Sequence, residues 1–377
     1  MMLDLLVKWL SSNFFLCLCL LLTISIGSVN GAKSKPKPIP KQSSESIVLT
    51  RELVNLCKGQ SPIAGKRMEK QLRWLIVASG ESSILLSTSP QHAAACWMLY
   101  VDQISKSRTG HEYMYQQRYA LAVLHYASTK TNTTKWDWHM AMDEPKVAAL
   151  SHGNWMRTNT HECDWYGVKC HRRNKVIYDI NLGYMKLDGI IPREVSLLTQ
   201  LKELDFHAND LQGIVPLRLI VSLPKLESLK LHMNGFFGMI QKEVFHLKQL
   251  KELILFGNYF GGTIPQELSE LKRLEHIDLY ANQLEGTIPA SLGVLKKLQF
   301  LDLHDNNLVG SVPKEICDLR KHHQLKELIV DCLPISAQQK QEVTCSCCTI
   351  CCRGLPDFKC VDVKTGLEIQ YKLQSQS

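Results

Sequence analysis

The hydrophobic residues in the middle of the chain recur at a fixed interval of 24 positions. Residues 250–273 and 274–297 align without a gap on the pattern LxxLxLxxNxLxGxIPxxLxxLxx, in which Ile or Phe replaces Leu at a few positions. The alternation within LxL predicts a short strand, and Asn, Gly and Pro follow at fixed places. A bundle of amphipathic helices is excluded, because its period would be about 3.6 or 7 and these three residue types would interrupt every helix.

The same columns extend in both directions and give six full repeats and a truncated seventh. Three positions depart from the pattern: Met185 stands where the first Asn is due, one extra residue precedes Leu223, and Gln241 replaces a Pro. We therefore expect the first coil to be less regular than the others. The full repeats begin at Ile177, Leu201, Leu226, Leu250, Leu274 and Leu298, and the seventh opens at Leu325.

Each column has a physical reason, and together the columns predict one architecture. The leucines of LxL point into the coil, and the residue between them faces outward. The Asn amide can satisfy backbone groups of the neighbouring coil, which would cost about 1–3 kcal/mol each if buried unpaired. One repeat cannot bury its apolar face alone, but six stacked repeats can. The sequence therefore predicts an α/β solenoid, a right-handed leucine-rich-repeat coil with cysteine-bearing caps.

The chain divides into further segments around this solenoid. Apolar residues at helical spacing predict helices within 67–79, 91–105 and 116–128, so a small helical region precedes the repeats. The predicted division is 1–31, a signal peptide or N-terminal anchor; 32–46, a basic Pro/Ser linker; 47–150, the helical region; 151–176, an N-terminal cysteine cap; 177–331, the repeats; and 332–377, a cysteine-rich C-terminal cap and tail.

Several motifs carry a resemblance to a known family. CDWYGVKC at residues 163–170, with Trp155 upstream, resembles the N-terminal cap of plant-type leucine-rich-repeat proteins, and the GxIP and GxVP elements are similar to the plant-type repeat. CSCCTICC at 345–352 and the segments 89–100 and 116–128 resemble repeat proteins of diatoms and related algae. The resemblance implies an extracellular or membrane-bound recognition protein. We expect no kinase domain, since few residues follow Cys360.

The N-terminus predicts export. Lys8, the apolar run 14–26 and Gly31 are arranged as a signal peptide with a cleavage site after Gly31. An uncleaved membrane anchor is the alternative, although the lysines beyond the run disfavour the simplest anchor. We expect an extracellular or cell-surface location, with membrane contact only if the apolar segment is retained. Asn132 opens a glycosylation sequon in a polar segment; an unmodified Asn is the alternative.

The 14 cysteines agree with export. Two lie in the predicted signal peptide, and the even number that remains is expected to form disulfides in an oxidising compartment. Cys163 and Cys170 are expected to pair locally, whereas Cys57 and Cys96 either pair or stay free. The eight cysteines within 317–360 allow 105 pairings. A zinc site is the rival interpretation of their CxCCxxCC motif.

Composition and motifs argue against several functional classes. The net charge of +8 comes from several basic segments rather than one face, so no nucleic-acid binding is expected. The sequence has no HExxH, GxSxG, P-loop or GxGxxG motif, so we expect no catalytic residue, no enzyme activity and no cofactor. The Asp-x-His pairs at 205–207 and 302–304 each lie on one strand face, but four repeats separate them, and no metal site is expected.

The residues beside the strand leucines predict a concave binding face. Adjacent parallel strands lie ~4.8 Å apart, so residues of one column form a contiguous strip. Acidic residues recur between the leucines, and imidazole or aromatic rings stand two positions later in five consecutive coils. Such rings on a rigid face are typical binding anchors, and a merely solvated surface is the alternative. The expected ligand-binding residues are Asp205, His207, Lys230, His232, Phe256, Asp278, Tyr280, Asp302 and His304.

These observations predict a recognition module that binds a protein, peptide or glycan on its concave face and needs a membrane co-receptor to signal. Reversal of Asp278 and Asp302 to Lys is expected to weaken a basic ligand without unfolding the coil. Three alternatives stay open: an inhibitor of a secreted hydrolase, a structural or adhesive wall component, and an intracellular scaffold with reduced cysteines.

Overall fold

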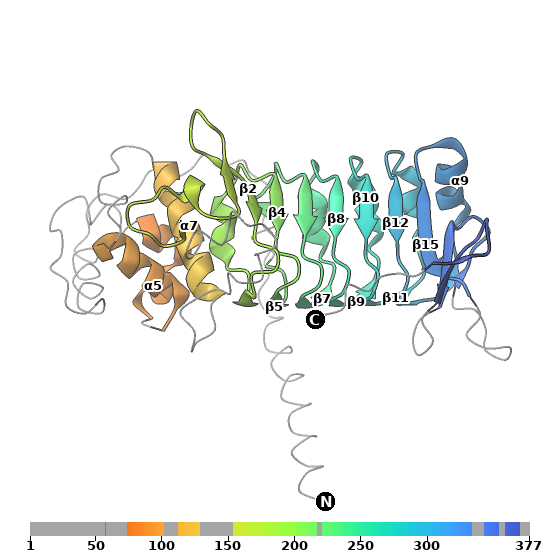
Figure 1. Cartoon of the computed structure of the whole chain (residues 1–377), viewed down its shortest axis with the longest axis horizontal. Coiled ribbons are helices and arrows are strands. Elements are labelled where there is room, and N and C mark those ends of the chain that lie inside the picture. The colour runs from red at the N-terminus through yellow and green to blue at the C-terminus, as the bar shows by residue number, and fades with distance from the viewer. Residues whose placement is uncertain are drawn as a thin grey trace, which may run out of the picture. The chain divides into compact units, whose positions relative to one another are not determined.

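The computed structural model describes residue 57 and residues 74–86, 88–101, 112–128, 154–216, 221–333, 343–353 and 359–369. The chain divides into two compact units, Met1–Ser44 and Glu45–Ser377, and every described residue belongs to the second. That unit contains a solenoid of parallel strands preceded by helices, which confirms the predicted leucine-rich-repeat coil (Figure 1). The predicted signal peptide or anchor, the basic linker and the Asn132 sequon lie outside the described residues.

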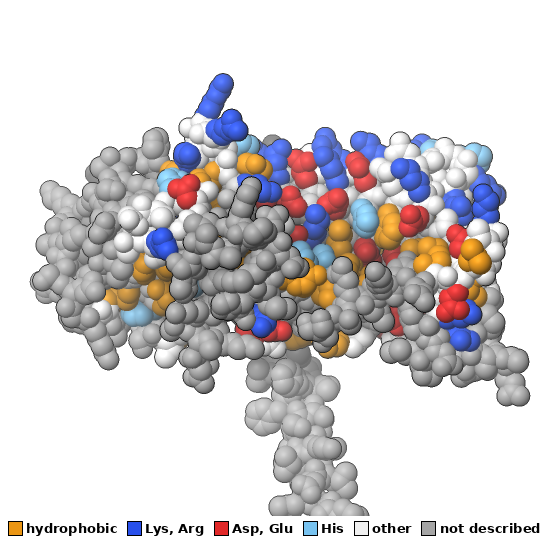
Figure 2. Space-filling view, viewed as in Figure 1, with side chains coloured by type: hydrophobic (Ala, Val, Ile, Leu, Met, Phe, Trp, Pro, Cys, Tyr) orange, Lys and Arg blue, Asp and Glu red, His pale blue; other side chains and the backbone are white. Residues whose placement is uncertain are grey.

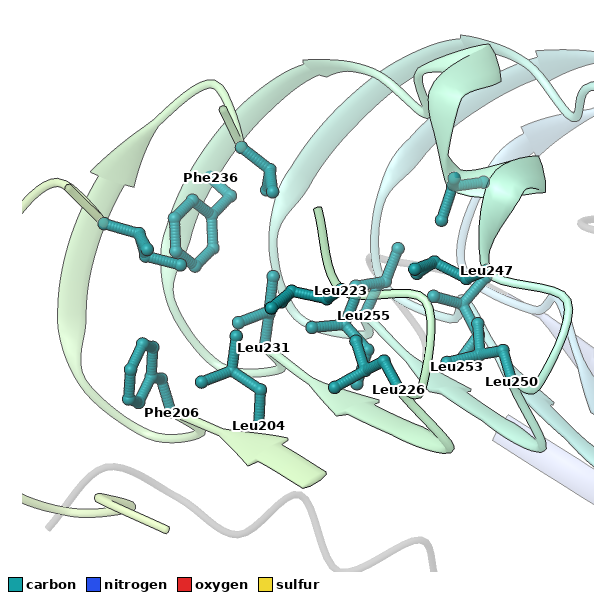
Figure 3. Packing of buried hydrophobic residues seen from close by; sticks show 14 of the residues in the cluster. Leu204, Phe206, Leu223, Leu226, Leu231, Phe236, Leu247, Leu250, Leu253 and Leu255 are labelled. Carbon is teal, nitrogen blue, oxygen red and sulfur yellow. The ribbon is translucent and has the colours of Figure 1, made fainter. Parts of the chain in front are cut away.

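The main sheet takes one strand from each repeat, including the truncated seventh. These strands are parallel and in register, so that Leu253, Ile277 and Leu301 stand side by side in successive coils. The inward side chains are buried and fill the interior of the coil (Figure 3). The strands described for this sheet are, in spatial order, β1 (Val168–Cys170), β2 (Ile177–Asn181), β4 (Glu203–Asp205), β6 (Ser228–Lys230), β8 (Glu252–Ile254), β10 (His276–Asp278), β12 (Phe300–Asp302), β15 (Glu327–Asp331), β17 (Ile350–Arg353), β18 (Lys359–Asp362) and β19 (Glu368–Ile369).

A second parallel sheet follows the Asn column, and the sequence pattern did not predict it. From the second coil to the sixth, the chain enters it through one residue of positive φ per coil, which is a Gly only at Gly257. The first coil is irregular, because Tyr184 and Lys186 both have positive φ and Met185 between them is buried. The strands of this sheet are β3 (Asp188–Gly189), β5 (Asp210–Gly213), β7 (Gly235–Met239), β9 (Tyr259–Thr263), β11 (Gln283–Gly286) and β13 (Asn307–Leu308).

Short helices on the convex side return the chain to the next main strand. The first four of them begin directly after the Pro of the repeat, or after Gln241 in the third coil, because this residue is extended with φ near −70°. A longer helix takes this place in the sixth coil. The elements are the 3₁₀ helices η5 (Arg193–Leu197), η6 (Lys242–His246), η7 (Gln266–Glu270) and η8 (Ala290–Val294), and the α-helix α9 (Lys314–His322).

The Asn side chains hold neighbouring coils together. Asn258 illustrates the arrangement: its Oδ1 accepts the backbone N–H of Phe236 at 3.0 Å. Its Nδ2 donates to the carbonyl oxygens of Leu231 in the preceding coil and of Leu255 and Phe256 in its own coil. The same pattern recurs at Asn209, Asn234, Asn282 and Asn306. Each Asn therefore satisfies backbone groups of two coils, as the column predicted.

Gln241 leaves a local packing defect. A cavity of about 30 Å³ lies beside it, lined among others by Val215, Met239 and Phe260. The Oε1 atom of Gln241 is buried and has no hydrogen-bond partner within the described residues. We therefore expect the departure from Pro at this column to make the third coil less stable than its neighbours.

The helical region docks on the N-terminal end of the solenoid through a buried polar cluster. Arg118 and Glu162 have fully buried side chains and form an ion pair of 3.1 Å. The guanidinium group of Arg118 also lies over the rings of Trp97 and Trp165, at 5.1 and 4.9 Å. Besides the helical turns of 74–79, the described elements here are α4 (Glu81–Leu85), α5 (Pro90–Cys96), the π-helix η1 (Trp97–Val101), α7 (Glu112–Ala127) and the 3₁₀ helix η4 (Glu162–Asp164).

Disulfides reinforce both ends of the solenoid. All cysteines in the described part of the chain are paired, which leaves no thiolate for the rival zinc interpretation. A small parallel pair, β14 (Gly310–Ser311) and β16 (Val343–Thr344), joins the C-terminal cap to the sixth coil. The pairs are Cys57–Cys96, Cys163–Cys170, Cys317–Cys347, Cys332–Cys351, Cys345–Cys348 and Cys352–Cys360.

Substitution of Asn258 by Ala is expected to lower the free energy of unfolding by about 3 kcal/mol, because it leaves several buried backbone groups unpaired. Chemical denaturation of the full-length chain measures the change. Gln283→Ala on exposed β11 is the control and should cost less than about 0.5 kcal/mol. Equal stability of the two variants would contradict the role assigned to the Asn column.

Substitution of Gln241 by Pro is expected to stabilise the protein by about 0.4–1 kcal/mol. Its φ of −72° already suits Pro, and Pro restricts the unfolded chain. The change also removes the unpaired Oε1 atom. Thermal unfolding of the variant beside wild type checks this, and a lower melting temperature would show that the Gln241 side chain supports the coil.

Candidate binding face

Five rings form a continuous stack across the concave sheet. His207, His232, Phe256, Tyr280 and His304 follow β4, β6, β8, β10 and β12 and occupy the same position in successive coils. Their centroids lie 4.7, 4.4, 4.4 and 4.7 Å apart in chain order, with stacked ring planes. The spacing equals the strand separation, so the repeat itself sets the stacking distance. The predicted strip of rings thus exists as one physical unit.

The stack has a defined N-terminal end. Gly183 occupies the ring position in the first coil, and a Cβ there would lie 2.2 Å from the His207 ring. Tyr184, the next residue, meets the His207 ring edge-on at 4.9 Å. Gly183 therefore gives the first ring of the stack room to lie flat, and Tyr184 closes the row.

The acidic column holds the rings rather than facing a ligand. Asp205 accepts hydrogen bonds from the His207 ring at 2.6 Å and from the His207 backbone N–H at 3.1 Å. Asp302 binds His304 in the same way. Burial alone would raise the pKa of Asp205, but the hydrogen bond and charge of His207 outweigh it and hold the pKa below its ordinary value. In both Asp-x-His pairs the carboxylate is thus engaged by the His two positions later.

Asp278 is the exception, because Tyr280 replaces His two positions later. Its Oδ1 atom is buried and has no hydrogen-bond partner within the described residues. Burial, followed by the neighbouring Asp302, raises the pKa of Asp278 to about 8. The group therefore carries a proton at neutral pH and offers no negative charge.

The accessible polar groups are Lys230, which shares the column of Asp205, and residues such as Glu203 and Glu252 two positions earlier on their strands, which the sequence analysis did not select. The ammonium group of Lys230 lies 3.2 Å from Glu203 and 3.3 Å from Glu252. Ser228 donates to Glu252 at 2.7 Å. Burial opposes the charge of Lys230, yet the two carboxylates raise its pKa above the ordinary value. The ring stack is therefore flanked by a bridged acid–base–acid row across β4, β6 and β8.

The C-terminal cap covers the far end of the strip. His304 is only 1% exposed, and its ring nitrogen lies within 4.8 Å of the disulfide sulfurs of Cys352 and Cys360. Phe300 and Ile369 of β19 pack on the same buried cluster. The sequence analysis did not predict that the C-terminal cap folds back over His304, because no sequence pattern of the cap indicates this contact.

Four of the predicted ligand contacts are corrected by this geometry. Asp205, Asp278, Asp302 and His304 are all less than a tenth exposed, so their side chains do not present a contact surface. The expectation that Asp278 and Asp302 tolerate reversal to Lys is corrected as well, because each lysine would bury an unpaired charge. The accessible part of the predicted face comprises His207, Lys230, His232, Phe256 and Tyr280.

The described residues hold two close groups of His and Cys side chains. One is Cys57, His92 and Cys96, and the other combines His304 with the cap disulfide Cys352–Cys360. In both groups the cysteines are bonded to each other, so they cannot serve as thiolate ligands. Neither group is therefore assigned as a metal site. Among the described helices none is long and apolar enough to cross a membrane.

Comparison with known proteins supports the repeat assignment. A family model described as Leucine Rich Repeat matches residues 249–271, 273–295 and 297–319. A probable inactive receptor kinase, At3g08680 of Arabidopsis thaliana, is 34% identical over 94 residues, which are 25% of this chain and 14% of that protein. The probable receptor-like kinase IRK of Arabidopsis thaliana is 34% identical over 74 residues, 20% of this chain and 8% of that protein. The chain thus spans less than a fifth of both relatives.

Two solved structures are also similar. A pollen receptor kinase 3 structure is 33% identical with a TM-score of 0.42, over 46% of this chain and 82% of that chain. A plant peptide hormone receptor, RGFR1 in complex with RGF2, is 33% identical with a TM-score of 0.41, over 45% of this chain and 29% of that chain. The family model and the curated relatives show that the chain carries leucine-rich repeats similar to those of plant receptor-like kinases.

The buried carboxyl of Asp278 predicts a specific pH dependence. Its pKa in the fold, about 8, lies above the ordinary value of 3.8, so the stability contributed by the protonated acid is complete below pH 4 and is lost as pH rises through 8. Asp278→Asn keeps the neutral form at every pH. We expect the variant to exceed wild type by about 1–3 kcal/mol at pH 8 and to match it near pH 4.

Thermal or chemical unfolding from pH 4 to 9 measures this difference. Glu285→Gln on the exposed face of β11 is the matched control, and its offset from wild type should not change with pH. If the stability difference between Asp278→Asn and wild type were also independent of pH, the carboxyl of Asp278 would be ionised in the folded protein over this range.

Proposed function

We propose that this protein is an extracellular or cell-surface recognition module that binds a peptide or a segment of another protein on the accessible concave strip. The strip consists of His207, His232, Phe256 and Tyr280 with the flanking Lys230. The single observation that carries the proposal is the ring stack, which holds four partly exposed aromatic or imidazole side chains in a fixed row.

The stack is suited to binding because its geometry is set before a ligand arrives. Each ring is held by its neighbours, and His207 is also held by Asp205. Rigid rings lose little conformational freedom on binding, so their buried area contributes to affinity with a small entropic cost. Burial, and then the charge of His207, lower the pKa of His232 to about 4, so the imidazole of His232 is uncharged at physiological pH.

The flanking row supplies polar specificity. Glu203, Lys230 and Glu252 present alternating charges beside the rings. An extended peptide running across the strands can place apolar side chains on the rings and polar groups on this row. The face continues across several coils, which favours a linear segment over a compact small molecule.

The curated relatives support placing this activity outside the cell, since they are plant receptor-like kinases with similar repeats. The six disulfides of the described residues support the same compartment. A membrane co-receptor is the partner that we propose for signalling. A hydrolase inhibitor would be the special case in which the bound segment belongs to an enzyme.

The double variant Phe256→Ala/Tyr280→Ala tests the proposal. The full-length protein is first screened against a displayed peptide library and a glycan array, and the affinity of each selected ligand is then measured for wild type and variant. Loss of two central rings should weaken a peptide ligand at least roughly tenfold.

Phe237→Ala/Tyr259→Ala is the control, because it removes the same two residue types from exposed positions on the second sheet. The control should bind like wild type. Equal binding by both double variants, or the absence of any peptide ligand, would refute the concave strip and favour a structural role.

A further inference from the structure

One edge of the solenoid gathers Lys and Arg side chains into a row. In the third to sixth repeats, the turns that lead from the convex side into the main strands carry one or two basic residues at the two positions before the first Leu. Figure 2 shows Lys and Arg side chains along this edge, at the top of the view. We define the basic edge as Arg172, Arg173, Lys225, Lys248, Lys272, Arg273, Lys296 and Lys297, all of them exposed. The sequence analysis expected the basic groups to be spread over several segments rather than one face; within the repeats, the structure instead places many of them along one edge.

The basic edge keeps most of its charge uncompensated. Lys248 forms an ion pair with Glu270 at 2.7 Å. No ion pair with another described residue is formed by Arg273, Lys296 or Lys297, nor by the two hairpin arginines. The nearby Glu227 is already engaged by Lys202 and Lys251. A net positive row therefore faces solvent.

The opposite edge has a different character. The second sheet begins there, and it carries Asp188 on β3, Asp210 on β5 and Glu285 on β11. The uncompensated cations of the turns before the main strands and these carboxylates of the second sheet therefore lie at opposite edges of the repeat domain. A charged polymer approaching the molecule would be oriented by this asymmetry.

A pocket lies at the N-terminal end of the basic edge. It has a volume of about 650 Å³ and is formed where the β1–β2 hairpin, the first two coils and α7 meet. Arginine side chains bind carboxylate and sulfate groups with paired hydrogen bonds, and amide and hydroxyl groups suit sugar hydroxyls. The lining residues are Tyr113, His171, Arg172, Arg173, Asn174, Val176, Thr199, Gln200 and Lys225.

We propose that the basic edge binds a linear anionic polysaccharide, with one acidic sugar in this pocket and the following sugars along the row. The coils repeat every ~4.8 Å, which suits a polymer with about one charge per sugar. Duplex DNA carries one charge per ~1.7 Å, which is far denser than the row. A membrane-binding surface would need apolar side chains to insert among the cations. In the row itself, the leucines next to the cations in the chain are buried and cannot insert into a membrane: Leu247, Leu271, Leu274, Leu295 and Leu298.

The test compares binding of the full-length chain to polygalacturonate, dextran sulfate, anionic lipid vesicles and duplex DNA at equal ionic strength. The edge variant is Lys272→Glu/Arg273→Glu/Lys296→Glu/Lys297→Glu. The control is Lys186→Glu/Lys242→Glu/Lys314→Glu/Lys364→Glu, which has the same net charge but alters exposed lysines elsewhere. We expect salt-dependent binding to at least one polysaccharide, at least roughly a tenfold loss in the edge variant, and less than about a twofold loss in the control.

Several results would overturn the proposal: no binding of wild type to either polysaccharide, tighter binding to vesicles or DNA, or an equal loss in the control. Replacement of the same four edge residues by Gln gives a second variant if the Glu variant does not fold. The Phe256→Ala/Tyr280→Ala variant should keep full polysaccharide binding. Failure of the concave strip and failure of the basic edge are therefore distinguishable.

Discussion

The hydrogen bonding of backbone groups inside the coil is the constraint on which the rest of the structure depends. Each turn after a main strand would bury unpaired N–H and C=O groups, and one Asn in each coil from the second to the sixth satisfies them on both sides of the gap. Because every Asn bridges two coils, the coils are fixed in register as well as stabilised. The concave face inherits that register, which is why rings from five separate repeats stack at the strand spacing.

The charge state of the Asp column depends on which residue follows two positions later in the same coil. Where His follows Asp two residues later, as at Asp205 and His207, the carboxylate fixes the ring and stays ionised. Where Tyr takes that place, Asp278 has no such partner and retains its proton. A single exchange in one column thus converts a charged, ring-holding pair into a neutral, buried acid. Side-chain identity at one position decides the electrostatics of its neighbour.

The sequence predicted the coil, its repeat boundaries and the row of rings, because all three follow from a fixed period. It did not predict the second sheet, since extended residues such as Tyr259–Thr263 lack the alternating pattern of a half-buried strand. It also overestimated the exposure of His304, because the position of Cys352 and Cys360 beside this ring depends on contacts between residues far apart in the chain. The docking of Arg118 on Glu162 was missed for the same reason. A periodic pattern can be recognised in one sequence, whereas a contact that occurs once between distant residues cannot.

Closure of both ends has a consequence for the lifetime of the molecule. Solenoids lose structure most readily by fraying from their terminal repeats. Here Cys163–Cys170 and the buried Arg118 cluster secure the first coil, and Cys317–Cys347 and Cys332–Cys351 secure the last coils. Proteases cut chains that open locally, so the ends offer them few starting points. Turnover would then begin in the middle of the coil, beside Gln241 and its cavity, and the durability of the whole protein would be set by its third repeat.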